Sequence, residues 1–290
     1  MDKHSSIFQD DWGTLKDIKA RLNVKPGSHP KFCKARPVPY AIKPKVEDEL
    51  DRLVGVGVLT KVNYSEWGTP IVPVMKKDGS VRLCGDFKVT LNPVLEVDQY
   101  PLPRTADIFA SLAGQKFSKL DLQHAYLQME VEESSRDLLT INTEKGLYRF
   151  NRLVYGVASA PAMWQRAMDT VLQGLKGVQC IIDDMLITGS TDEEHLQNLE
   201  AVLERLDRYG LRLRKDKFLH PLHRLLEKNR KWEWNGDCAR AFAEVKKLVT
   251  SNEVLTHWVV CHASPHKPNN QHQGWPGEPA FLHARPVASP

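Results

Sequence analysis

The sequence has few cysteines, and their spacing fits neither a zinc site nor a disulfide framework. Its 290 residues include five cysteines, and none of them forms a Cys-x-x-Cys pair; they are Cys33, Cys84, Cys180, Cys238 and Cys261. Structural zinc sites usually contain such pairs, and disulfide frameworks contain an even number of cysteines. We therefore expect reduced thiols in an intracellular protein, cytoplasmic or nuclear.

Long apolar segments are also lacking. No run of about 18 apolar residues occurs, so we expect no membrane span. Residues 1–11 are polar and lack the apolar centre of a secretory signal peptide. Lys and Arg number 40 and Asp and Glu number 36, which gives a net charge of 40 − 36 = +4. This small excess is found in nucleic-acid-binding proteins and in many metabolic enzymes, so the charge leaves the functional class open.

Local patterns predict an α+β fold. Residues 1–45 contain five prolines and are expected to form an extended lead-in, with one short helix near Leu15–Arg21. Beyond them, helical and strand-like patterns interleave, and a basic turn separates two short strands. That interleaving favours an antiparallel sheet over a doubly wound parallel one. The predicted elements are helices at Lys45–Val54, Pro161–Leu172 and Asp192–Tyr209 and a hairpin of Ile71–Met75 with Val81–Cys84.

Three aspartates form the most informative constellation. Asp183 and Asp184 stand between the apolar runs Val178–Ile182 and Met185–Thr188. Taken alone, they are more often the turn of a hairpin. Asp121 follows the apolar segment Phe117–Leu120, and a lone aspartate there is commonly a turn residue or a helix N-cap.

The three carboxylates would converge if their strands are neighbours. Carboxylates brought together repel one another and need a cation. Hard oxygen ligands suit Mg²⁺, with Mn²⁺ as the alternative ion. Two such ions about 4 Å apart activate a 3′-hydroxyl and stabilise a leaving pyrophosphate, which is nucleotidyl transfer. A metal-dependent phosphoesterase would explain the paired aspartates equally well, but not the segments considered next.

Four segments resemble the motifs of reverse transcriptases, in the order that this family has. They are Lys77–Phe87 (the fingers hairpin), Leu120–Tyr126 (motif A), Gly156–Gln165 (motif B) and Ile182–Asp184 (motif C). The resemblance covers roughly residues 12–218, and the order and spacing of the motifs are similar to those of Ty3/gypsy-type LTR retrotransposon polymerases. It implies a right-hand polymerase palm with an antiparallel sheet and fingers.

The resemblance also implies roles for residues of motifs A and C. Asp121 and Asp183 would hold both metal ions, with Asp184 assisting and the backbone of Leu122 contributing. Tyr126 would lie under the incoming sugar and exclude a 2′-hydroxyl, so that deoxynucleotides are selected. Without the resemblance, Tyr126 would simply be a core aromatic residue.

Further roles fall on the fingers and on motif B. Arg82 would grip the triphosphate, with Lys76 or Lys77 nearby, although charged residues at a hairpin tip are commonly only solvated. Tyr155 and Gln165 would contact the nucleotide or the template. Gln165 could equally be a residue of the helix surface.

Three features concern the end of the motif series. Lys215 or Lys217 stands where a motif D lysine would protonate pyrophosphate. Ile181 departs from the family pattern, which usually has an aromatic residue that touches the primer end. After Phe218, the primer grip and the thumb are not recognisable, so we expect no complete thumb.

The resemblance divides the chain into four parts. Residues 1–45 form the lead-in, 46–218 the fingers and palm, 219–260 a partial connection toward a ribonuclease H domain, and 261–290 a disordered tail. His262 stands where that domain would begin its metal site with an aspartate. We therefore expect ribonuclease H activity to be absent from this chain.

The resulting functional hypothesis is an RNA-directed DNA polymerase. Its partners would be an RNA or DNA template with a primer and deoxynucleoside triphosphates, with no membrane; no sequence feature indicates an oligomeric state. The alternative is a catalytically impaired or inactive retrotransposon remnant that at most binds nucleic acid. The absence of a recognisable primer grip motivates it, because backbone contacts dominate nucleic-acid affinity.

Overall fold

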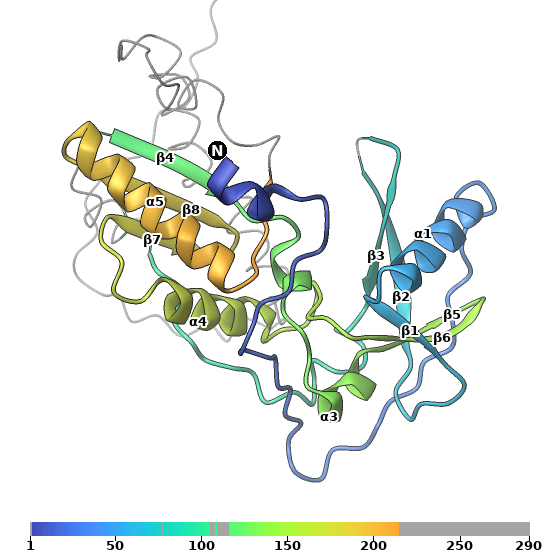
Figure 1. The fold of residues 1–290 in the computed structure, drawn as a ribbon. Helices are drawn as coiled ribbons and strands as arrows, with labels where there is room; N and C mark the ends of the chain where they lie inside the picture. The colour runs from blue at the N-terminus through green and yellow to red at the C-terminus, as the bar shows by residue number, and fades with distance from the viewer. Residues whose placement is uncertain (1, 77, 105–107, 109–115, 215–290) are drawn as a thin grey trace, which may run out of the picture.

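The computed structural model describes residues 2–76, 78–104, 108 and 116–214, and Figure 1 shows their arrangement. The elements in chain order are η1 (Asp2–Phe8), α1 (Lys43–Gly55), β1 (Leu59–Val62), β2 (Thr69–Met75), β3 (Val81–Gly85), β4 (Lys116–Asp121), η2 (Ala125–Gln128), α3 (Glu133–Arg136), η3 (Asp137–Leu139), β5 (Thr140–Thr143), β6 (Gly146–Phe150), α4 (Ala160–Leu172), β7 (Val178–Ile181), β8 (Asp184–Gly189) and α5 (Asp192–Arg208). The expected α+β class is confirmed.

Two separate sheets organise these elements. One has the strand order β1-β6-β5-β2-β3 and carries α1, and the other has the order β4-β8-β7 and lies beside α4 and α5 (Figure 1). All pairings are antiparallel except that of β2 with β5. The predicted hairpin is confirmed as β2 and β3, whose register pairs Val74 with Arg82.

The helices follow their sequence signals closely. Pro161 lies in the first turn of α4, where its missing N–H costs no hydrogen bond. Thr191 caps α5 by accepting a hydrogen bond from the Glu194 N–H at 3.2 Å, and Glu194 accepts one from the Ser190 N–H at 2.7 Å. Gly210, with a φ of 73°, follows the end of α5. No helix among the described residues combines the length and apolar character that a membrane span requires.

The N-terminal region differs from the expectation of a lead-in with a helix near Leu15–Arg21. The helix of this region is η1, at Asp2–Phe8, and Ala20 instead forms a parallel bridge with Val131. The Ala20 N–H donates to the carbonyl of Glu130 at 2.8 Å, and the Glu132 N–H donates to the carbonyl of Ala20 at 2.9 Å. The backbone at Ala20 therefore pairs with a segment that is distant in the sequence, and a local sequence pattern does not reveal such pairing.

Candidate functional site

The three-stranded sheet, of β4, β8 and β7, brings two of the predicted aspartates face to face. Asp121 ends β4, Asp184 begins β8, and the two are direct partners in the antiparallel register. Directly paired residues project from the same face of a sheet, so both carboxylates emerge on one side. Asp183 lies in the turn beside them, and its carbonyl accepts a hydrogen bond from the Leu122 N–H at 3.0 Å.

The turn itself lies one residue earlier than the sequence suggests. An Asp183-Asp184 turn was expected, whereas β7 ends at Ile181 and β8 begins at Asp184, which leaves Ile182 and Asp183 in the turn. The cause is the pairing of Asp184 with both Ile181 and Asp121. Ile182 has a φ of 55°, a left-handed conformation that is costly for a β-branched residue.

Two side chains of α4 hold this strained turn. The Trp164 Nε1 donates to the carbonyl of Ile182 at 2.7 Å. The Gln165 Oε1 accepts from the Ile182 N–H at 2.9 Å, and its Nε2 donates to the carbonyl of Cys180 at 2.9 Å. Gln165 is fully buried, at 0% exposure. Gln165 is therefore not a residue of the helix surface, and its amide binds the turn; a contact with the nucleotide or the template stays a prediction.

The three carboxylates share a strongly coupled electrostatic environment. Burial, followed by the charges of Asp184 and Asp121, raises the pKa of Asp183 to about 6. Asp184 forms an ion pair with Lys119, with Oδ1 and Nζ 2.9 Å apart. Asp121 lies 3.9 Å from the Nε of Arg214. Asp183 therefore loses its proton at a higher pH than an ordinary aspartate, and a nearby cation would favour its ionised form.

A divalent cation fits part of this donor set. In the described part of the chain, no group of three or more His, Cys, Asp and Glu side chains is arranged to hold a metal ion. At the site, Asp184 is paired with Lys119. The carboxylates of Asp121 and Asp183 supply the hard oxygens that Mg²⁺ prefers, and a cation beside Asp183 would oppose the rise in its pKa that burial and its neighbours cause.

An aromatic cluster lies next to the carboxylates. The rings of Tyr126 and Tyr155 are 4.8 Å apart, and Trp164 meets Tyr126 edge-on at 6.2 Å. The Cζ of Arg82 lies 5.5 Å from the centre of the Tyr155 ring. Burial, followed by the charge of Asp183, raises the pKa of Tyr155 to about 12. Tyr126, Tyr155 and Arg82 are thus brought together, although only 6% of Tyr126 is exposed.

The remaining predicted residues are placed only in part. Lys76 is exposed at the end of β2, next to the turn of the fingers hairpin. Lys77, Lys215 and Lys217 lie outside the described residues.

Several neighbours of the site were not identified from the sequence. Lys119 and Arg214 neutralise carboxylates, and Trp164 holds the turn. The ring of Trp12 stacks on that of His124 at 4.7 Å. Lys119 could have been found, because it lies two residues before Asp121 and so shares its face of the strand. The stack of Trp12 on His124 has no local signal, since 112 residues separate them (124 − 12).

Comparison with known proteins identifies the fold and the family. The chain is 40% identical over 213 residues to the protein K02A2.6 of Caenorhabditis elegans, an alignment covering 73% of this chain and 17% of that protein. It is 30% identical over 214 residues to the retrovirus-related Pol polyprotein from transposon 412 of Drosophila melanogaster, covering 70% and 17%. The chain therefore spans about a sixth of the length of these curated relatives.

A solved structure has the same fold. The foamy viral protease-reverse transcriptase in complex with RNA/DNA hybrid superposes with a TM-score of 0.68 at 24% identity, over 74% of this chain and 29% of that one. The expected polymerase palm and fingers fold is thereby confirmed, as is the resemblance to retrotransposon polymerases. The family model described as reverse transcriptase (RNA-dependent DNA polymerase) matches residues 74–244, more than half of the chain, and the chain therefore belongs to the reverse transcriptase family.

Proposed function

We propose that this chain is a reverse transcriptase core that adds deoxynucleotides to a primer 3′ end by two-metal nucleotidyl transfer. The observation that carries the proposal is the register that pairs Asp121 with Asp184 and sets Asp183 in the adjoining turn. Palm carboxylates in this arrangement suit phosphoryl chemistry, in which positioning and charge neutralisation supply most of the catalysis.

The metal site of the proposal rests on two carboxylates. Asp121 and Asp183 would hold Mg²⁺, or Mn²⁺ in its place, with the backbone of Leu122 contributing. When bound, the ions lower the pKa of the attacking 3′-hydroxyl and neutralise charge on the phosphates. Asp184 would assist after Lys119 releases it, because a carboxylate in an ion pair at 2.9 Å is already neutralised.

The chain's own side chains would position the nucleotide. Arg82 is a cation of the fingers hairpin beside the ring of Tyr155, and it would bind the triphosphate together with Lys76 or Lys77. Tyr126, packed between Tyr155 and Trp164, would present a rigid surface under the sugar and exclude a 2′-hydroxyl.

Other parts of the proposal extend beyond the described residues. Lys215 or Lys217 would protonate the pyrophosphate, and both follow Arg214 directly in the sequence. Fingers and palm would occupy residues 46–218, with 219–260 as a connection and 261–290 as a tail. An RNA or DNA template with a primer and deoxynucleoside triphosphates would be the substrates, and no ribonuclease H activity is expected from this chain.

Primer extension on an RNA template tests the proposal. The full chain should incorporate deoxynucleotides with Mg²⁺, and Asp183→Asn should reduce the rate by at least about a thousandfold, the size of effect expected when a catalytic group is lost. Wild-type incorporation that equals that of Asp183→Asn would refute the activity.

One feature of the structure and one of the sequence favour a second candidate function. Lys119 pairs with Asp184 and Arg214 with Asp121, so cationic side chains compete with a metal for these carboxylates. Ile181 stands where the family usually has an aromatic residue that touches the primer end. An impaired polymerase that at most binds nucleic acid would follow. Binding that weakens steeply with salt, without extension, distinguishes it from the active enzyme.

A further inference from the structure

The N-terminal strap, defined as residues 6–16, runs along the segment that follows α5 (Figure 1). The Thr14 N–H donates to the carbonyl of Gly210 at 3.0 Å, and the Leu213 N–H donates to the carbonyl of Ile7 at 2.8 Å. The contact depends on glycine, because a Cβ on Gly210 would lie 2.6 Å from the Thr14 carbonyl oxygen. The strap is therefore packed into the palm, backbone against backbone.

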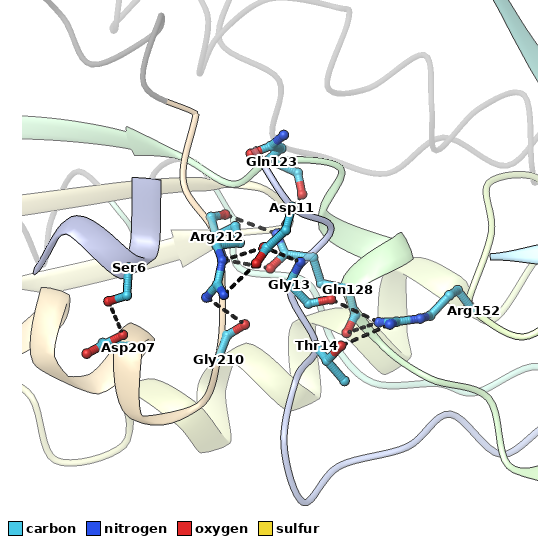
Figure 2. A network of polar contacts seen from close by, with 10 residues as sticks. All are labelled: Ser6, Asp11, Gly13, Thr14, Gln123, Gln128, Arg152, Asp207, Gly210 and Arg212. Atoms are coloured by element: carbon cyan, nitrogen blue, oxygen red, sulfur yellow. Dashed lines mark hydrogen bonds and ion pairs between the residues drawn. The ribbon is translucent and has the colours of Figure 1, made fainter. Parts of the chain in front are cut away.

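A two-point ion pair joins the strap to this segment. The Asp11 Oδ1 lies 2.5 Å from the Nε of Arg212, and its Oδ2 lies 2.9 Å from the Nη2, as Figure 2 shows. The hydrogen bond from Arg212 is the main cause that lowers the pKa of Asp11. Asp11 also accepts from the Gly13 N–H at 3.0 Å. Paired charge-assisted bonds of this geometry fix orientation as well as distance.

The segment held by the strap in turn holds the chain around Asp121. The Arg214 N–H donates to the carbonyl of Asp121 at 2.9 Å, and the Gln123 N–H donates to the carbonyl of Arg212 at 3.0 Å. Gln128, which is fully buried, accepts from the Arg212 N–H at 2.7 Å and donates to the carbonyl of Gln123 at 2.5 Å (Figure 2). These bonds form a continuous path from Asp11 through Arg212 to Asp121.

We propose that Asp11 is a positioning residue for the reaction. It acts through Arg212, keeping residues 212–214 against Asp121 and Gln123 and placing the Arg214 side chain 3.9 Å from the Asp121 carboxylate. An effect of Asp11 on catalysis rests on the proposed function, because it requires that the chain be a polymerase. It extends the site to a part of the chain outside residues 74–244, the part that matches the family model.

Amide hydrogen exchange of the full chain tests the path directly and needs no activity. Asp11→Asn keeps the shape of the side chain but removes the charge, and should speed exchange at residues 121–123 and 212–214 about tenfold, as expected for a lost charge-assisted pair. Asp207→Asn is the matched control. It weakens another contact of the strap, the bond from Ser6 Oγ to Asp207 at 2.5 Å, which ends on α5 (Figure 2). It should leave exchange at residues 121–123 unchanged within about twofold.

Kinetics then separate positioning from general destabilisation. Asp11→Asn should lower kcat of primer extension about tenfold with an unchanged KM for the template-primer, and Asp11→Glu should recover most of it. Equal exchange at residues 121–123 in Asp11→Asn and the wild type would overturn the inference. A wild type without extension would instead refute the proposed function and leave the exchange result to decide the role of Asp11.

Discussion

The indole Nε1 of Trp164 donates a 2.7 Å hydrogen bond to the carbonyl of Ile182, the residue that precedes Asp183. Ile182 has a left-handed backbone, and such strain persists only where surrounding contacts outweigh it. The position of the Asp183 carboxylate therefore depends on a helix side chain that itself carries no charge.

Trp164→Phe should test this dependence. Phenylalanine keeps an aromatic ring in the fully buried position but removes the donor, so the Ile182 carbonyl keeps the longer 3.5 Å bond from the Cys180 Sγ and loses the stronger one. We expect the free energy of unfolding to fall by about 1–3 kcal/mol. Urea denaturation measures it. Arg166→Ala is the control, because Arg166 is exposed on the same helix and its ion pair with Asp98 is worth less than about 1 kcal/mol. Equal losses in the two variants would contradict the role of the indole.

The pKa of Asp183 predicts a stability that depends on pH. Because this pKa is raised from 3.8 to about 6, the folded protein keeps a proton that the unfolded chain has released between these values. Stability should therefore fall as pH rises through this window, by up to about 3 kcal/mol. Asp183→Asn should remove the dependence, so that without divalent ions the variant melts higher than the wild type at pH 7.5. A variant that melts lower than the wild type at every pH would rule this out.

Much of this site follows from local sequence signals. The hairpin of β2 and β3 and the cap of α5 by Thr191 appear as predicted, since each depends on residues close together in the chain. The convergence of Asp121 with the Asp183-Asp184 pair was also expected, because strand-end carboxylates meet when their strands are neighbours.

The parts that escaped prediction depend on distant contacts. The turn lies at Ile182-Asp183 because Asp184 belongs to β8, where it pairs with Asp121. No local rule predicts a β-branched residue such as Ile182 at positive φ. The bonds of the Gln165 amide with Cys180 and Ile182 join α4 to the turn, and no local pattern predicts them. The bonds of Asp11 and Ile7 with residues near 212 span some 200 positions of sequence, beyond any periodicity.

The pair of Lys119 and Asp184 gives a third stability test. Their side chains are only 9% and 17% exposed. Lys119→Met would leave the charge of Asp184 largely buried and unpaired, which should cost about 3 kcal/mol in chemical denaturation without divalent ions. Mg²⁺ should restore part of the loss by taking the place of the ammonium group.

Two further variants check that the cost comes from the unpaired charge. Lys119→Met combined with Asp184→Asn should regain most of the stability, since no carboxylate is then left alone. Lys19→Met, which breaks a more exposed pair with Glu130, should cost less than about 1 kcal/mol. A double variant no more stable than Lys119→Met would show that the lysine acts through packing of its stem instead.

Ile181 offers a gain-of-function test of the proposed polymerase. It ends β7, is paired with Asp184 and is half-buried, so a larger side chain there can extend toward the site. Ile181→Tyr restores the aromatic residue usual in the family. Because an aromatic contact with a base contributes about 1–3 kcal/mol, KM for the template-primer should fall at least fivefold with kcat nearly unchanged. Steady-state primer extension measures both constants. Ile181→Leu, which adds no aromatic surface, should behave like the wild type, and an equal fall in KM in that variant would show that size alone, and not an aromatic contact, improves primer binding.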